Sequence, residues 1–388
     1  MLVFSLFSLY YLLIGLASAT VLPGTNTTLE ARAGTFSNPL NQNRGADPCM
    51  RFINGRYFLT STQNTNIQMR SATTIESLKT ASPSVIFSDS TSGRNFDFWA
   101  PEFWFLNGRW YIYYAVAGNG DDNTHRLHVL QGGTDANNPM SGSYTYVNSL
   151  IPSNFNAWAV DGSILQLDSR LYFIFSGKTT AAQWTQCTYI APMSSPTALS
   201  GPAVQISCPN LSWEIAATPV QEGPEAITVG GVTHIVYSAS HCSTDDYQLG
   251  MLTLRTGADP LVASSWTKVN FWDPASVRIA DRSSSPPSTC PFAQILRTPI
   301  PSLHATTQRK CTDRDIMAIY DPDSPSPTMI SFMFQKDNQW MFAYHAKSAP
   351  GQGCGDLRTT RVQPFQIVGG STPSFPAAVG TGVAVAEP

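Results

Sequence analysis

The hydrophobic positions of this chain fall in short runs that are typical of β-strands. From about residue 36 onward, Val, Ile, Tyr, Phe and Trp cluster in runs of five to seven residues, and Gly, Asn, Asp and Ser bound these runs. The spacing of three and four residues that an amphipathic helix requires is not sustained over any long stretch. The pattern therefore predicts an all-β protein.

Tight-turn signals recur between the predicted strands at a regular interval. Asn54-Gly55 and Asn107-Gly108 are strong hairpin signals, because a type I′ turn needs positive φ at both central residues. Equivalent turns end at Ser169 and Gly231, and the successive separations are 53, 61 and 62 residues. A repeat of this length corresponds to one four-stranded blade of a radial array. With a further turn at Asp337-Asn338, the sequence predicts a five-bladed β-propeller.

One stretch breaks this period. Gly231 and Asn338 are 107 residues apart, and the excess falls in residues 272–328, which hold nine of the 28 prolines and several Ser-rich runs. The stretch is either a long surface loop or a segment foreign to the fold, such as a wrongly predicted exon boundary. Both interpretations predict an irregular Pro/Ser-rich insertion before the fifth blade.

Acidic residues precede four of the turns by six to nine residues, namely Asp47, Glu102, Asp161 and Glu222. In a propeller the innermost strands begin at one face, so these side chains are expected to converge in one funnel. Each acid alone is also an ordinary turn or cap residue; the equivalent spacing across blades is what indicates a site. Glycosidic hydrolysis needs one carboxylate base and one protonated carboxylic acid, and a third acid nearby raises the pKa of the proton donor.

The N-terminus has the features of a secretory signal. Leu2–Leu16 is almost wholly apolar, and the small residues Ala17-Ser18-Ala19 follow. A membrane anchor is the alternative, but a spanning helix needs roughly 20 apolar residues. We therefore expect a secreted, extracellular protein with four parts: a signal peptide at 1–19, a leader at 20–35, a propeller at 36–370 and a flexible C-terminal tail at 371–388.

The chain has seven cysteines, and secretion would place them in an oxidising environment. Cys187 and Cys208 flank one predicted hairpin and are favoured as a pair, and Cys242 and Cys354 follow aromatic strands and could pair across blades. An odd count leaves one thiol over. The absence of CxxC or Cys/His zinc spacing argues against a structural metal site.

The charge of the chain excludes some partners. Charged residues make up 13% of the chain, the net charge is −3, and no basic patch contains interleaved aromatic residues, which argues against a nucleic-acid partner. The aromatic content is compatible with sugar ligands. Asn26 and Asn210 begin N-glycosylation sequons, which predict a glycoprotein.

Short motifs around the acids resemble glycoside hydrolase family 43. They are Ala46-Asp47-Pro48, Trp99-Ala100-Pro101-Glu102, Asp161-Gly162-Ser163, Glu222-Gly223-Pro224 and the sequence GQGCGDLRTTRVQP that begins at Gly351. The resemblance covers about residues 36–270 and 329–368. It implies a five-bladed propeller that cleaves arabinose or xylose linkages with inversion.

The resemblance also implies catalytic roles. Asp47 would be the general base, Asp161 the residue that modulates the pKa of the acid and orients it, and Glu222 the general acid. Glu225 is the alternative acid. Glu222 is preferred because it begins the Glu-Gly-Pro motif.

Further residues are implied for the sugar pocket, namely Trp99, Glu102 and Arg358. The resemblance implies no required cofactor, although members often carry a Gly-Pro-Gly-His motif whose histidine lies in the channel with a cation or water. Residues 324–328 read SPSPT at that place, and the surroundings of His304 do not match the motif. The missing motif coincides with the irregular insertion, which favours a disrupted opening of blade five and no metal site.

The Glu-Gly-Pro-Glu-Ala and Gly-Gln-Gly-Cys-Gly-Asp segments look most like secreted α-L-arabinofuranosidases, including exo-acting enzymes on α-1,5-arabinan. The expected partner is an arabinose-containing polysaccharide or oligosaccharide, and the expected state is a monomer. The alternatives are a β-xylosidase or endo-arabinanase of the same family, or a catalytically impaired sugar-binding paralogue. A retaining fructan hydrolase is disfavoured because its Asn-Asp-Pro-Asn and Glu-Cys-Pro motifs are absent.

Overall fold

A computed structural model describes residues 34–180, 184–270, 327–349 and 351–388. The predicted signal peptide, most of the predicted leader, and residues 272–326 of the irregular insertion with His304 lie outside these described residues. Helical elements in the described part are two 3-10 turns, η1 (Glu76–Lys79) and η2 (Ala263–Ser265). No helix there is long and apolar enough to cross a membrane.

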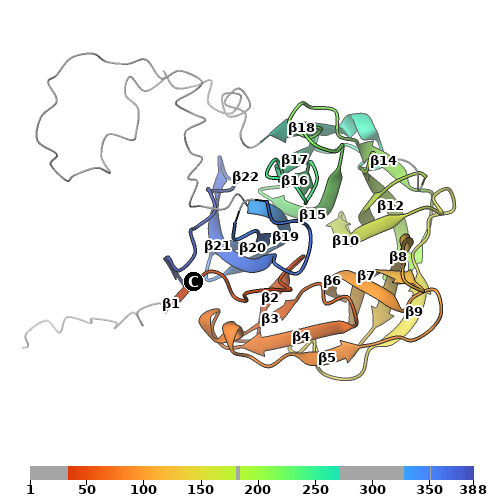
Figure 1. Cartoon of the computed structure of the whole chain (residues 1–388). Helices are drawn as coiled ribbons and strands as arrows, with labels where there is room; N and C mark the ends of the chain where they lie inside the picture. Colours follow the sequence, from red (N-terminus) through yellow and green to blue (C-terminus); the bar gives the residue numbers. More distant parts are fainter. Residues whose placement is uncertain (1–33, 181–183, 271–326, 350) are drawn as a thin grey trace, which may run out of the picture. The chain divides into compact units, whose positions relative to one another are not determined.

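The strands form five antiparallel sheets arranged around a centre, which confirms the predicted five-bladed propeller (Figure 1). Four sheets have four strands and the third has five, because β14 pairs with β12 beside β13. The strands of blades one to five, in that order, are β2 (Cys49–Ile53), β3 (Arg56–Thr60), β4 (Ile67–Ala72) and β5 (Ser84–Phe87); β6 (Phe96–Leu106), β7 (Arg109–Gly118), β8 (Asp121–Gln131) and β9 (Thr145–Ser149); β10 (Ala159–Leu167), β11 (Arg170–Gly177), β12 (Cys187–Ser195), β13 (Ala198–Leu199) and β14 (Val204–Ser207); β15 (Gln221–Val229), β16 (Val232–Ala239), β17 (Gln248–Leu254) and β18 (Trp266–Asn270); β19 (Pro327–Lys336), β20 (Gln339–Ala346), β21 (Thr359–Val368) and β22 (Thr372–Ser374).

The first strand of each blade lies nearest the centre. Strand β2 contacts β6 and β19, β10 contacts β6 and β15, and β15 contacts β19, so the five inner strands form a closed ring. The turns that join each inner strand to the next have the predicted left-handed backbone, with φ of 46° at Asn54, 50° at Asn107, 49° at Asp168 and 48° at Asp337. Asparagine, aspartate and glycine tolerate this conformation, which explains why they recur at these turns.

Aromatic and aliphatic side chains fill the interfaces between neighbouring blades. Phe103 and Ile112 of blade two and Phe173 of blade three are fully buried in one such cluster. Burying one side chain of this size contributes about 1.5–3 kcal/mol. Most of the aromatic residues therefore form the core. The few rings that remain accessible at the centre are the candidates for contact with a ligand.

The C-terminal segment, predicted as a flexible tail at 371–388, packs against the propeller in the structure. Strand β23 (Ala384–Ala386) pairs with β1 (Thr35–Ser37) near the start of the described chain, and Val385 and Phe375 are buried. The Asn38 side chain also exchanges two hydrogen bonds with the backbone of Val362 in blade five, at 2.8 and 2.9 Å. These long-range contacts join the two ends of the domain.

Candidate active site

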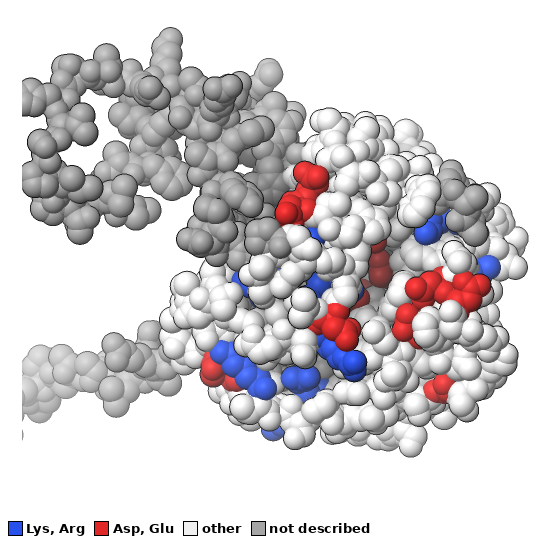
Figure 2. All heavy atoms as spheres, viewed as in Figure 1, with Lys and Arg blue, Asp and Glu red and all other residues white. Residues whose placement is uncertain are grey.

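The inner strands bring three of the predicted acids into one cavity of about 210 Å³. Asp47 precedes β2, Asp161 lies in β10 and Glu222 lies in β15. Figure 2 shows a hollow at the centre of this face, with acidic side chains in its depth and both acidic and basic side chains around it. The volume is below the roughly 300–1,000 Å³ of pockets for drug-sized ligands, so it suits a ligand of about one sugar ring.

Local backbone irregularities aim these acids into the cavity. Asp47 and Asp161 have left-handed φ values of 52° and 56°. The register of β10 shifts between Val160 and Ser163, and that of β15 shifts between Glu222 and Glu225. A β-bulge changes the direction of the side chains around it, and such strained positions concentrate at functional sites.

The environment of Asp47 stabilises its charged form. Thr62 donates a hydrogen bond to Asp47 Oδ2 at 2.5 Å, and Arg358 Nη1 lies 3.6 Å from Oδ1. Burial opposes ionisation, but the Arg358 guanidinium and these hydrogen bonds outweigh it and hold the pKa of Asp47 well below its usual range. Asp47 is therefore ionised at neutral pH, as a general base must be.

Asp161 and Glu222 have the opposite electrostatic environment. Burial and the nearby charges of Glu222 and Asp47 raise the pKa of Asp161 well above its usual range, although the Gly223 N–H donates to its Oδ2 at 3.0 Å. Burial and the charge of Asp47 raise the pKa of Glu222 as well. The Asp161–Glu222 pair therefore retains a proton under conditions in which Asp47 has lost its own.

Two residues without a signal in the sequence contact Asp47 and Glu222. Tyr247 is fully buried and its hydroxyl donates to Glu222 Oε1 at 2.5 Å. His345, at the end of β20, accepts a hydrogen bond from the Asp47 N–H through Nδ1 at 3.0 Å. The two rings stack with 6.3 Å between their centroids. Both come from outer strands or loops of their blades, so the spacing of inner strands could not reveal them.

Comparison with known proteins identifies the family of this propeller. Residues 36–274, more than half of the chain, match the model described as Glycosyl hydrolases family 43. The chain belongs to that family. Solved family 43 folds resemble it closely: an α-L-arabinofuranosidase from Lactobacillus brevis, at 24% identity, superposes with a TM-score of 0.69 and covers 90% of this chain and 98% of its own.

Curated relatives support the family 43 assignment. An extracellular exo-α-(1→5)-L-arabinofuranosidase of Streptomyces avermitilis is 34% identical over 250 residues, which are 63% of this chain and 51% of the relative. The α-L-arabinofuranosidase 43 of Humicola insolens is 32% identical over 241 residues, 61% of this chain and 49% of the relative. A probable arabinan endo-1,5-α-L-arabinosidase A of Aspergillus fumigatus is 28% identical over 232 residues, 58% of this chain and 68% of the relative. The chain thus spans about half the length of the first two relatives.

Of the residues predicted for the sugar pocket of this family 43 protein, Trp99 and Arg358 line the cavity and Glu102 does not. The predicted contact of Glu102 with the sugar stays a prediction, and the lining of this cavity does not include Glu102. The register of β6 shifts twice, between Phe96 and Trp99 and between Trp99 and Glu102, so that Asp97 and Trp99 reach the cavity instead. Neither bulge is visible in the sequence.

Glu102 and Glu225 belong to a separate buried cluster outside the cavity lining. Ser163 donates to Glu225 Oε2 at 2.9 Å, and Trp104 donates to Glu102 Oε2 at 2.9 Å. The Arg51 guanidinium lies 4.2 Å from the Trp104 ring centroid and interacts with both carboxyl groups. Glu225 faces this cluster. Of the two glutamates in the Glu-Gly-Pro-Glu segment, Glu222 is therefore the one that lines the cavity.

Replacing Glu102 by glutamine should stabilise the protein at neutral pH. Burial raises the pKa of Glu102 to about 7 from an ordinary 4.5. The folded state then binds more protons than the unfolded state between these values, so folding stability falls as pH rises through this interval. Chemical denaturation from pH 4.5 to 8 measures this effect. At the upper end of this pH range, the free energy of unfolding of Glu102→Gln should exceed that of the wild type by on the order of 2 kcal/mol.

The exposed turn carboxylate provides the control for this change. Asp168→Asn preserves the left-handed turn. The difference in unfolding free energy between this variant and the wild type should not grow with pH. If the free energy of unfolding depended on pH equally in the wild type and in Glu102→Gln, Glu102 would not be the group responsible for the change in stability.

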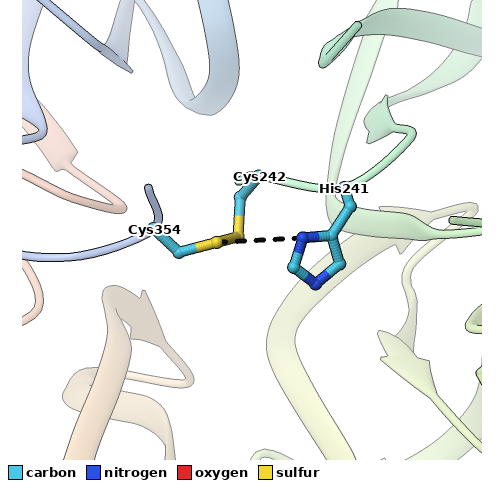
Figure 3. A group of neighbouring side chains, drawn as sticks. All are labelled: His241, Cys242 and Cys354. Atoms are coloured by element: carbon cyan, nitrogen blue, oxygen red, sulfur yellow. Dashed lines mark hydrogen bonds between the residues drawn. A yellow bond between two sulfur atoms is a disulfide. The ribbon is translucent and has the colours of Figure 1, made fainter. Parts of the chain in front are cut away.

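The predicted disulfides Cys187–Cys208 and Cys242–Cys354 are both present, and Cys49 is buried and free. His241, Cys242 and Cys354 form the one group of potential metal ligands in the described residues (Figure 3). The two sulfur atoms are bonded to each other and are not thiolates, so the group offers a single nitrogen to a metal. The place of the family's channel-histidine motif, at 324–326, lies outside the described residues.

Proposed function

We propose that this chain is a secreted, inverting glycoside hydrolase that releases α-L-arabinofuranosyl residues from arabinan or arabinoxylan. The observation that carries the proposal is the difference in protonation across one cavity, where an ionised Asp47 faces the proton-retaining pair Asp161 and Glu222. Inverting glycosidases need this difference between two carboxyl groups.

Each residue has a definite task in this reaction. Asp47 takes a proton from a water molecule that attacks the anomeric carbon, and Glu222 gives its proton to the departing glycosidic oxygen. Asp161 shares the retained proton with Glu222, because burial and the repulsion between their charges disfavour ionisation of both carboxyl groups. Arg358 keeps Asp47 ionised, and water attacks from the side opposite the leaving group, which inverts the configuration.

Several findings support arabinose as the substrate and secretion as the destination. The names of the curated relatives include exo-α-(1→5)-L-arabinofuranosidases and arabinan endo-1,5-α-L-arabinosidases. The small volume of the cavity favours the exo-acting class, because it leaves little room for a long run of sugars on both sides of the scissile bond. Two disulfides are typical of proteins in oxidising compartments, in agreement with the N-terminal signal pattern.

The test is an assay of the purified full chain on 4-nitrophenyl α-L-arabinofuranoside and on linear α-1,5-arabinan. We expect arabinose as the product from both, and proton NMR of the first turnovers should show the β-anomer before mutarotation. Oligosaccharide products from arabinan would indicate the endo-acting alternative, and faster release of xylose from xylo-oligosaccharides would indicate a β-xylosidase. Binding of arabino-oligosaccharide without hydrolysis would overturn the proposal in favour of a sugar-binding protein.

A further inference from the structure

Two tryptophans in the cavity wall each have one ring face covered by another side chain. His125 is fully buried and stacks on Trp99 with 3.8 Å between centroids and an interplanar angle of 22°. Lys178 Nζ lies 3.9 Å from the centroid of Trp158, and the Trp158 indole N–H donates to the Asp122 carbonyl at 2.9 Å. These contacts fix the orientation of both rings, and both residues line the cavity.

The Trp158 side of the cavity is the side of Glu222. The Lys178 N–H donates to the Trp158 carbonyl at 3.0 Å, and the Lys178 ammonium is close enough to Glu222 for their charges to interact. Gln186 also donates to Glu222, at 3.2 Å from Oε2. Arg358 contacts Asp47, with 3.6 Å between Nη1 and Oδ1, and its charge also acts on Glu222. Lys178 thus links Trp158 to the proposed acid, whereas the direct ion pair of Arg358 is with the proposed base.

Asp97 is a further carboxyl group in the wall of the cavity, besides Asp47, Asp161, Glu222 and Asp356. It comes from β6 of blade two with a left-handed φ of 51°, and its side chain hydrogen-bonds with Asp122. Its backbone carbonyl contacts His125 Nε2 at 3.0 Å, which connects it to the support of Trp99. A carboxylate beside an open indole face accepts hydrogen bonds from sugar hydroxyls and repels a sugar that carries its own carboxylate.

We propose that Trp158 and Asp97 form the subsite for the sugar on the leaving-group side of the scissile bond, and that its ligand is a neutral pentosyl unit. This rests on the proposed function, because a general acid must lie next to the oxygen that it protonates, and Trp158 and Lys178 form the wall beside Glu222. The free indole face packs on the apolar face of the ring, and Asp97 binds its hydroxyls. Binding energy from this remote sugar then contributes to turnover.

The experiment compares two substrates that differ in the leaving group. α-1,5-Arabinotriose places a sugar in the proposed subsite, whereas 4-nitrophenyl α-L-arabinofuranoside places an aryl group with little need of protonation there. Trp158→Ala should lower kcat/KM for arabinotriose by about tenfold to a hundredfold and for the aryl substrate by less than about threefold. Asp97→Asn should show the same selectivity to a smaller degree.

Trp184→Ala is the matched control, because this tryptophan is 73% exposed and lies outside the cavity lining. It should leave both rates unchanged, and melting temperatures should show that all three variants fold. Equal losses on both substrates in Trp158→Ala would mean that Trp158 only positions the catalytic acids, and unchanged rates on both would exclude the subsite. A wild-type protein that hydrolyses neither substrate would refute the proposed function itself.

Discussion

Glu222→Gln should lower kcat on α-1,5-arabinan by about 10²- to 10⁴-fold, the usual contribution of a positioned general acid. The amide keeps the shape of the side chain, and its oxygen can still accept the hydrogen bond from Tyr247, although its NH2 cannot accept the one from Gln186. It has no acidic proton to give to the leaving oxygen. The same variant should lose much less activity on 4-nitrophenyl α-L-arabinofuranoside, because nitrophenolate departs without protonation. Steady-state kinetics on the two substrates measure this difference.

Asp47→Asn distinguishes the base from the acid. Activation of water is needed for every substrate, so this variant should lose a similar factor of about 10²- to 10⁴-fold on both. Glu225→Gln tests the alternative acid, and it should lose less than about tenfold because Glu225 contacts Ser163 and faces away from the cavity. Full activity in Glu222→Gln, or a selective loss on arabinan in Glu225→Gln, would contradict the assignment of the acid.

The pH profile of the wild type should follow from the same electrostatics. The acidic limb reports the protonation of Asp47, whose pKa is held low chiefly by Arg358 against the effect of burial. The basic limb reports loss of the proton that burial and like charges retain on the Asp161–Glu222 pair. Activity should therefore extend further into the acidic range than an ordinary carboxylate base would allow.

The sequence predicted those features of the fold that depend on local chemistry. Asn54 and Asn107 specify turns that only a few residue types tolerate, and the regular interval between such turns indicates blades. Asp161 and Glu222 could be placed because inner strands of successive blades are equivalent. Glu102 lies outside the cavity lining, since two register shifts in β6 bring Trp99, as predicted, and Asp97 to the cavity.

Contacts between distant parts of the chain could not be predicted in this way. Tyr247 and His345 reach Glu222 and Asp47 from positions outside the inner strands, and only the closed ring of blades brings them there. The pairing of β23 with β1 joins segments about 350 residues apart and has no local signal at all. Residues 371–388 were predicted as a flexible tail, and in the structure Phe375 and Val385 of this segment are buried.

Removing the Cys242–Cys354 disulfide should impair both stability and catalysis. Cys242 follows β16 of blade four, and Cys354 lies four residues before Arg358 in the segment that leads to β21. Both cysteines line the cavity. The bond therefore fastens the segment that carries Arg358 to a neighbouring blade, and blade one holds it from the other side through the Arg44–Asp356 ion pair at 3.1 Å.

The expected effects have separate physical origins. The bond spans 112 residues in sequence, and loss of a link of this length destabilises a protein by about 2–5 kcal/mol. Loosening of Arg358 weakens its hold on Asp47, so the pKa of Asp47 should rise and kcat/KM should fall by about tenfold at low pH, with the acidic limb displaced toward neutral pH. Chemical denaturation and pH-dependent kinetics of Cys242→Ser/Cys354→Ser measure the two effects.

The Cys187→Ser/Cys208→Ser variant is the control, because that disulfide spans only 21 residues and neither cysteine lines the cavity. It should lose stability while its pH profile stays in place. If both double variants shifted the acidic limb equally, general loosening of the fold would account for the change. If neither shifted it, the hydrogen bonds from blade one, such as that from the Gly45 N–H to the Arg358 carbonyl at 2.9 Å, would suffice to hold Arg358 against Asp47.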